Sequence, residues 1–77
     1  MDPIEQRVLE CFANVFPDVP RERLPKLSQA SVAEWDSVVH VTLLTALAEE
    51  FAFELDYERV EDLRSFALVL DYVRSQS

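Results

Sequence analysis

The sequence predicts a small all-α domain, a four-helix bundle of three longer helices and a short third helix with a long first loop. Apolar residues recur at helical spacing in three stretches, at residues 3–16, 37–51 and 66–75. No stretch alternates apolar and polar residues for more than a few positions, which disfavours a β-sheet. The 77 residues suffice for one core, so we expect residues 1–77 to form a single domain.

The first helix is predicted at residues 3–16, followed by a long connection. Asp2 is a favourable N-cap and Pro3 suits the first helical position. Residues 17–35 contain three prolines and no clear period, which predicts a loop with at most one turn near residues 21–24. The apolar anchors of this loop are predicted to be Val19, Leu24 and Leu27.

The second helix is predicted from Ser37 to Phe51, the strongest amphipathic run of the chain. Its apolar residues are expected to share one inward face. These residues are Val38, Val41, Leu43, Leu44, Leu47, Ala48 and Phe51.

Two further N-caps predict the remaining helices. Asp56 precedes a short third helix at about residues 57–63, with Val60 and Leu63 pointing inward. Ser65 precedes a fourth helix at about residues 66–75. Its expected core residues are Phe66, Val69, Leu70, Tyr72 and Val73.

Charge and composition narrow the possible partners. The net charge of −8 disfavours nucleic acid and anionic membrane surfaces, and favours partners with basic patches. One cysteine, Cys11, allows no internal disulfide, and with a single histidine it predicts no zinc site. No apolar run approaches the roughly 20 residues of a membrane span, and the first residues mix charges with apolar side chains. We therefore expect a cytoplasmic monomer without stable membrane insertion.

The most informative segment is Trp35-Asp36-Ser37-Val38, which ends a polar loop and opens the second helix. Asp36 and Ser37 are suitable caps, so the Ser37 hydroxyl should project from a helix N-terminus. Unpaired N–H groups and the helix dipole favour negative charge there. This is a suitable position for attaching a phosphate-linked group.

This segment resembles the phosphopantetheine attachment site of the acyl carrier protein family. Asp36-Ser37-Val38 stands where that family has Asp-Ser-Leu. Other segments are similar to the end of the family's second helix and to both ends of its last helix. These are Leu47-Ala48-Glu49-Glu50-Phe51, Leu63-Arg64-Ser65-Phe66 and Asp71-Tyr72-Val73.

The resemblance implies a carrier rather than an enzyme, with no catalytic residue of its own. A phosphopantetheinyl transferase would attach 4′-phosphopantetheine from coenzyme A to Ser37, with Asp36 as helix cap and motif neighbour. The arm would carry an acyl or related group as a thioester to acyl-loading, acyl-transferring or condensing enzymes. Cargo could shelter in the bundle, where the resemblance places Leu47, Val60 and Leu63. Fatty acyl, polyketide, aminoacyl and cell-envelope groups all remain open.

The expected partner surface departs from the family pattern, which often has acids soon after the serine. Here acids are delayed until Glu49 and Glu50 and continue to residue 62, with Arg59 the one basic residue of that stretch. We expect an exposed Val39 to contribute to partner choice. The predicted partner-binding residues are Val38, Val39, His40, Thr42, Glu49 and Glu50.

Two other functions remain open. The first is an acidic helical interaction module of the same fold without a prosthetic group. The second is a hydrolase with Ser37 as nucleophile and His40 as base. A hydrolase also needs an orienting acid, an oxyanion hole and a substrate cleft, and the sequence pattern suggests none of these. Trp35 and Cys11 are expected to be packing residues.

Overall fold

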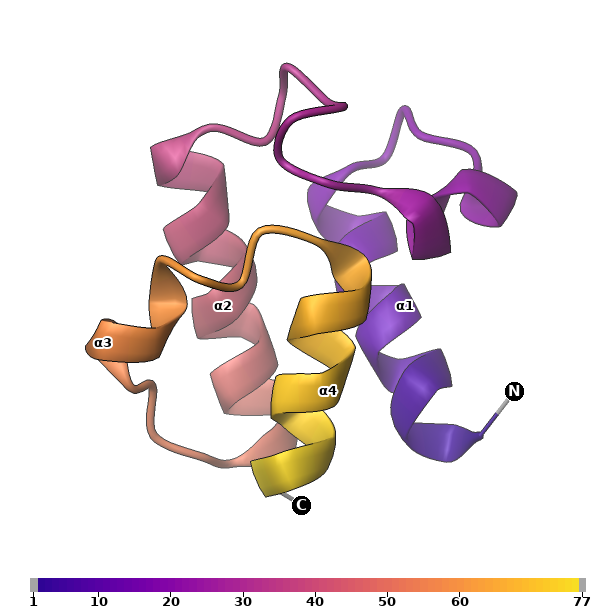
Figure 1. The fold of residues 1–77 in the computed structure, drawn as a ribbon. Coiled ribbons are helices and arrows are strands. Elements are labelled where there is room, and N and C mark those ends of the chain that lie inside the picture. Colours follow the sequence, from indigo (N-terminus) through magenta and orange to yellow (C-terminus); the bar gives the residue numbers. More distant parts are fainter. Residues whose placement is uncertain (1, 77) are drawn as a thin grey trace.

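The computed structural model describes residues 2–76 and confirms the all-α class (Figure 1). Its elements are α1 (Pro3–Val15), the 3-10 helix η1 (Arg21–Lys26), α2 (Ser37–Phe51), α3 (Tyr57–Val60) and α4 (Phe66–Gln76). Among these residues the β-type pairing is a single isolated bridge between Ser28 and Ser65. The radius of gyration is 11.2 Å, close to the roughly 11 Å expected for a compact domain of this length.

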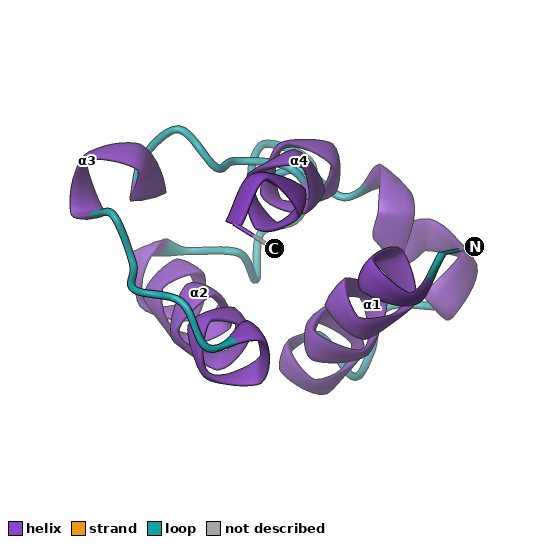
Figure 2. Ribbon diagram, turned by 90° about the horizontal axis from the view of Figure 1, so that it is seen from below, coloured by secondary structure: helices purple, strands orange, loops and turns teal. Residues whose placement is uncertain are grey.

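The three longer helices enclose one hydrophobic core. Figure 2 shows α4 lying over the space between α1 and α2, with α3 at the outer side of α2 and α4. Aromatic rings fill the end of the core nearest the long loop. The Phe12 ring centroid lies 4.8 Å from that of Phe66 and 5.6 Å from that of Trp35, which is 2% exposed.

Helix α1 begins as predicted and ends one residue early. The Asp2 carboxylate accepts a hydrogen bond from the Glu5 N–H at 2.8 Å and caps the helix. Phe16 is the C-cap rather than the last helical residue, and its ring is buried. Arg74 of α4 forms an ion pair with Asp2, which joins the last helix to the start of the first.

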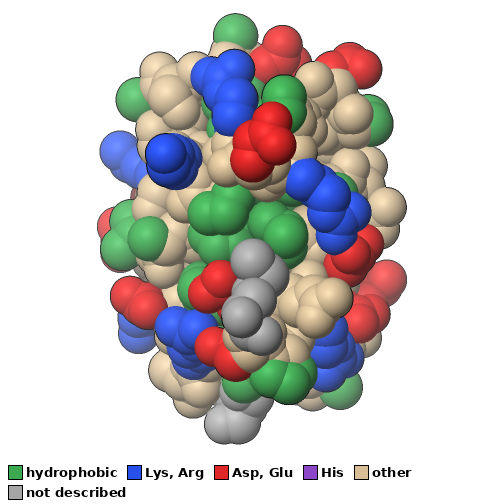
Figure 3. Space-filling model, turned by 90° about the vertical axis from the view of Figure 1, so that its right-hand side faces the viewer, with side chains coloured by type: hydrophobic (Ala, Val, Ile, Leu, Met, Phe, Trp, Pro, Cys, Tyr) green, Lys and Arg blue, Asp and Glu red, His purple; other side chains and the backbone are tan. Residues whose placement is uncertain are grey.

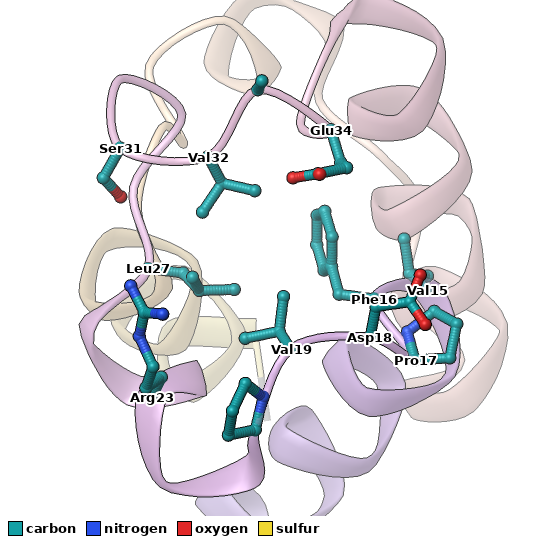
Figure 4. Close-up of a pocket in the computed structure, with 12 residues that line it drawn as sticks. Val15, Phe16, Pro17, Asp18, Val19, Arg23, Leu27, Ser31, Val32 and Glu34 are labelled. Atoms are coloured by element: carbon teal, nitrogen blue, oxygen red, sulfur yellow. The ribbon is translucent and has the colours of Figure 1, made fainter.

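The long loop is more ordered than the prediction of at most one turn. It contains the six-residue helix η1, which includes Pro25. The predicted anchors Leu24 and Leu27 are buried, and Val19 is half-buried against the core. In Figure 4 the side chains of Val19, Leu27, Val32 and Phe16 point into a hollow of about 470 Å³ between the loop and the end of α1.

Backbone hydrogen bonds tie this loop to the start of α4. The Gln29 N–H donates to the Arg64 carbonyl at 2.7 Å, and the Phe66 N–H donates to the Leu27 carbonyl at 3.0 Å. The loop therefore closes the end of the bundle at which α2 begins.

The bounds of α2 are confirmed, but its predicted inward face is partly wrong. Val38 and Val41 are 75% and 54% exposed. The buried residues of the helix are His40, Leu43, Leu44 and Leu47. Their spacing of three, one and three residues defines the stripe that faces the core. Val38 and Val41 lie outside this stripe.

Helix α3 is shorter than predicted because the chain turns after Val60. Asp56 caps it, as expected, by accepting from the Glu58 N–H at 3.0 Å. The Leu63 N–H then donates to the Val60 carbonyl three residues back at 3.2 Å, a tighter spacing than an α-helix uses. The turn carries Leu63 into the core, where it is 4% exposed.

The N-cap of α4 is also confirmed, since the Ser65 hydroxyl accepts from the Leu68 N–H at 3.2 Å. The helix runs one residue further than predicted. All five of its expected core residues are buried.

Candidate functional site

Ser37 is the first residue of α2 and is exposed. The Asp36 carboxylate accepts from the Val39 N–H at 2.9 Å, so Asp36 is the N-cap that the sequence predicts. The Asp36 carbonyl accepts the first intrahelical bond, from the His40 N–H at 2.8 Å. Ser37 therefore stands at the positive end of a 15-residue helix, where a phosphate group is favoured.

A hollow of about 610 Å³ adjoins Ser37 and lies between the start of α2, α3 and the two flanking loops. We call it the Ser37 groove. Its lining residues are Gln29, Ser37, His40, Val41, Tyr57, Val60, Glu61 and Arg64. Val41 and Tyr57 supply exposed apolar walls, and Arg64 supplies a positive charge. The Arg64 guanidinium is oriented by its Nε, which donates to the Glu61 carbonyl at 2.8 Å.

His40 is buried rather than exposed, which corrects its prediction as a partner-binding residue. The residue is 7% exposed. The Trp35 indole Nε1–H donates to His40 Nδ1 at 2.9 Å, and His40 Nε2 lies 2.6 Å from the Val60 carbonyl. An indole nitrogen only donates and a carbonyl only accepts, so these partners select the neutral tautomer with its proton on Nε2.

The same geometry removes the support for the hydrolase alternative. A general base must accept a proton from the nucleophile through a ring nitrogen. Both nitrogens of His40 are directed at Trp35 and Val60 instead of at Ser37.

The predicted partner face is rearranged along the start of α2. Val38, which was predicted both on the inward face and among the partner residues, is exposed. Thr42 is also exposed, and its hydroxyl donates to the Val38 carbonyl at 3.0 Å. Val39 is half-buried against the core, so the prediction that it is exposed is wrong. This face also includes Val41 and Tyr57, which were not predicted to belong to it. Tyr57 is 77% exposed.

The two predicted acidic partner residues differ in their surroundings. Glu49 is exposed near the end of α2. Glu50 pairs with Arg7 of α1 at 3.1 Å, and its backbone carbonyl accepts a second bond from the same guanidinium at 2.7 Å. The Arg7 guanidinium also lies 4.4 Å from the Phe51 ring centroid. Glu50 is therefore engaged within the molecule.

The three predicted cargo residues are not gathered around the groove. Leu47 is fully buried and Leu63 is 4% exposed, both within the core. Val60 alone of the three lines the Ser37 groove. Sequence reasoning missed Gln29 and Arg64, because the backbone pairing of two distant loops brings them to this place. The exposed aromatic side chain of Tyr57, directly after a helix cap, was a signal that could have been used.

The remaining surface carries mixed charge. On the face formed by α1 and η1, acidic and basic side chains are interspersed around an apolar centre (Figure 3). Two ion pairs join neighbouring segments: Arg21 of η1 with Glu10 of α1, and Arg74 of α4 with Asp2. Burial, followed by the Glu50 carboxylate, raises the pKa of the Cys11 thiol, so this thiol is a weak nucleophile.

Residues 2–76 offer neither a metal cluster nor a membrane-spanning helix. These residues contain no cluster of three His, Cys, Asp or Glu side chains suited to a metal ion. None of the described helices is long and apolar enough to cross a bilayer. No protein-family model matches the chain, and no curated protein sequence matches it either.

Proposed function

We propose that the protein is a carrier whose Ser37 receives 4′-phosphopantetheine from coenzyme A and whose arm presents acyl or related groups as thioesters. The observation that carries this proposal is the position of the Ser37 hydroxyl. It is exposed at the first residue of a long helix, next to the Asp36 cap, and it borders a groove of about 610 Å³.

The surroundings of Ser37 suit a phosphodiester. The N-terminus of α2 offers the positive end of a helix dipole, and Arg64 adds a cation at the groove. When attached, the arm supplies the thiol that forms the thioester. The protein provides an accessible hydroxyl and a rigid platform, and the transferase provides the base that activates the serine.

The exposed side chains near Ser37 suggest how partner enzymes dock. Val38, Val41 and Tyr57 are large apolar side chains left in solvent beside the attachment point. Single exposed apolar residues are common, but a group of them marks an interaction site. We infer apolar contact at the start of α2, with the acids of residues 49–62 steering basic partners from a distance.

The test is intact-mass measurement after incubation with coenzyme A and a transferase of broad specificity. Wild type should gain one phosphopantetheine group, and Ser37→Ala should gain none while keeping its helical circular dichroism. Ser65→Ala is the control, because Ser65 also lies at a helix start, as the N-cap of α4, but follows Arg64 rather than an aspartate. Equal mass gain in wild type and Ser37→Ala would refute the assignment.

The interaction module without a prosthetic group is the second candidate, and the same apolar patch favours it. An unchanged wild-type mass with a folded protein would favour this module over the carrier.

A further inference from the structure

His40 occupies the place where a cargo group would have to enter the bundle from Ser37. It lies one turn along α2 from the serine, and its imidazole joins α2 to the Val60 carbonyl of α3 at 2.6 Å. His40 as a residue is 7% exposed, and it also lines the Ser37 groove. It therefore forms a boundary between the groove and the core.

Trp35 holds the His40 imidazole from the core side. Trp35 donates to the other ring nitrogen of His40, and the centroids of the two rings are 5.9 Å apart. The Trp35 ring also contacts Phe12 and Phe16, with ring centroids 5.6 and 5.7 Å away. The indole is thus held by the aromatic end of the core, and the imidazole is held by the indole and by α3.

The core on the inward side of α2 is filled by buried side chains. Leu43, Leu44 and Leu47 are each at most 1% exposed, and Leu63 is 4% exposed. An alkyl chain entering here would have to break the part-buried hydrogen bond between His40 and Val60 and displace close-packed leucines. On the outer side, Val41 and Tyr57 offer apolar surface that is already open.

We propose that the His40 imidazole, held between Trp35 and Val60, closes the bundle beneath Ser37, so that cargo on the arm lies in the Ser37 groove and stays out of the core. This inference rests on the proposed loading of Ser37 and specifies how the cargo is held. Short or polar cargo, contacting Val41, Tyr57 and Arg64, suits this groove better than a long alkyl chain. Partner enzymes then receive the cargo without extracting it from the protein.

The first experiment compares the phosphopantetheine form with the octanoyl form by ¹H–¹⁵N NMR and thermal unfolding. Octanoyl attachment should shift the amide signals of Val41, Tyr57 and Arg64 and leave those of Leu47 and Leu63 in place. The midpoint of unfolding should change by less than about 1 °C, since little additional apolar surface is buried. Shifted Leu47 and Leu63 signals, with a midpoint raised by several degrees, would overturn the proposal.

A second experiment removes the imidazole that separates the Ser37 groove from the core. His40→Thr removes both hydrogen bonds of the imidazole, so its octanoyl form should be stabilised relative to its own unacylated form and should show shifted Leu47 and Leu63 amides. Thr45→Ala, on an exposed position of the same helix, should behave as wild type. If His40→Thr does not fold, Trp35→Phe replaces it, because it removes the donor to Nδ1 and keeps an aromatic ring. Folded variants that respond to acylation as wild type does would contradict the role of His40.

Chemical attachment of an alkyl chain at position 37 tests the role of His40 without the transferase. In Ser37→Cys, the exposed thiol should react with a dodecyl methanethiosulfonate ahead of the buried Cys11. The attached chain should shift the groove amides and spare those of Leu47 and Leu63, even where Ser37 itself is never loaded. Absence of loading on wild type overturns the proposed function, whereas insertion of the dodecyl chain into the core overturns the closure by His40.

Discussion

Replacing His40 with Phe should destabilise the fold strongly, although the two rings are similar in size. The substitution keeps an aromatic ring beside Trp35 and deletes the hydrogen bonds to Trp35 Nε1 and to the Val60 carbonyl. Trp35 is 2% exposed, so its N–H would be left buried without an acceptor. Such a group costs about 1–3 kcal/mol.

The second lost bond is only part-buried, and water can replace the imidazole at the Val60 carbonyl. It should add at most about 1 kcal/mol, for a total of about 1–4 kcal/mol. A domain of this size has a free energy of unfolding of roughly 4–12 kcal/mol. The midpoint of thermal unfolding should therefore fall by at least about 5 °C.

A double-mutant cycle isolates the indole–imidazole bond. His40→Phe, Trp35→Phe and the double variant are unfolded in urea and followed by circular dichroism at 222 nm, since two of the variants lack tryptophan fluorescence. The double variant has phenylalanine at both positions, so no ring nitrogen is left buried without a partner. Its loss should therefore be smaller than the sum of the single losses by about 1 kcal/mol or more. Additive losses, or a His40→Phe loss below about 0.5 kcal/mol, would refute this account of His40.

Three further predictions concern other parts of the fold. Ala52 ends α2 with φ of 55°, so Ala52→Gly should raise the free energy of unfolding in urea by about 0.5–1 kcal/mol. The buried thiol of Cys11, whose pKa is raised by desolvation, should react with a disulfide reagent at least roughly tenfold slower in the native than in the urea-unfolded protein. The hydrogen bond from the Glu5 N–H, assisted by Arg74, lowers the pKa of Asp2 below 3.8. Asp2→Asn should therefore be less stable than wild type at pH 6, and the difference should shrink below about pH 4, where the wild-type carboxylate becomes protonated.

Each of these has a distinct contrary result. A neutral or destabilising Ala52→Gly would show that the left-handed alanine is not strained. Equal native and unfolded rates for Cys11 would contradict its burial. For Asp2, asparagine caps a helix nearly as well as aspartate, so the predicted difference comes from the carboxylate charge. A stability difference that is the same at pH 6 and pH 3 would contradict this role of the charge.

The helix starts were predictable because an N-cap is a local interaction. Asp2, Asp36, Asp56 and Ser65 each accept a hydrogen bond from a backbone N–H two or three residues ahead. Such a bond depends on a few consecutive residues. The position of Ser37 at the first turn of α2 follows from the same local rule, and that position is the basis of the functional proposal.

The arrangement around Ser37 was less predictable because distant segments build it. Gln29 and Arg64 meet through the backbone pairing of two loops, and no spacing in the sequence encodes this pairing. The helix η1 was also missed, since Pro25 and the neighbouring prolines favour a loop on local grounds. The burial of Leu24 and Leu27 supplies the stabilisation that the local sequence lacks.

The orientation of α2 could not be read from its apolar residues, because apolar side chains occur around most of the helix. Val38, Val39 and Val41 offer no contrast by which to choose the inward side. A lone histidine was the natural choice for the outward side, since histidine is fully buried less often than valine. The satisfied hydrogen bonds of His40 reverse that choice.

The burial of His40 then determines several features of the candidate site together. With His40, Leu43, Leu44 and Leu47 facing inward, the helical period leaves Val38 and Val41 on the outside beside Ser37. The same orientation leaves apolar side chains exposed beside Ser37 and places the imidazole between the Ser37 groove and the core. A substitution at His40 should therefore alter partner binding even without a direct contact, because loss of its bonds lets α2 rotate or α3 move away. Partner affinity and cargo position should change together in His40→Thr, whereas a substitution at the exposed Val38 should change partner affinity alone.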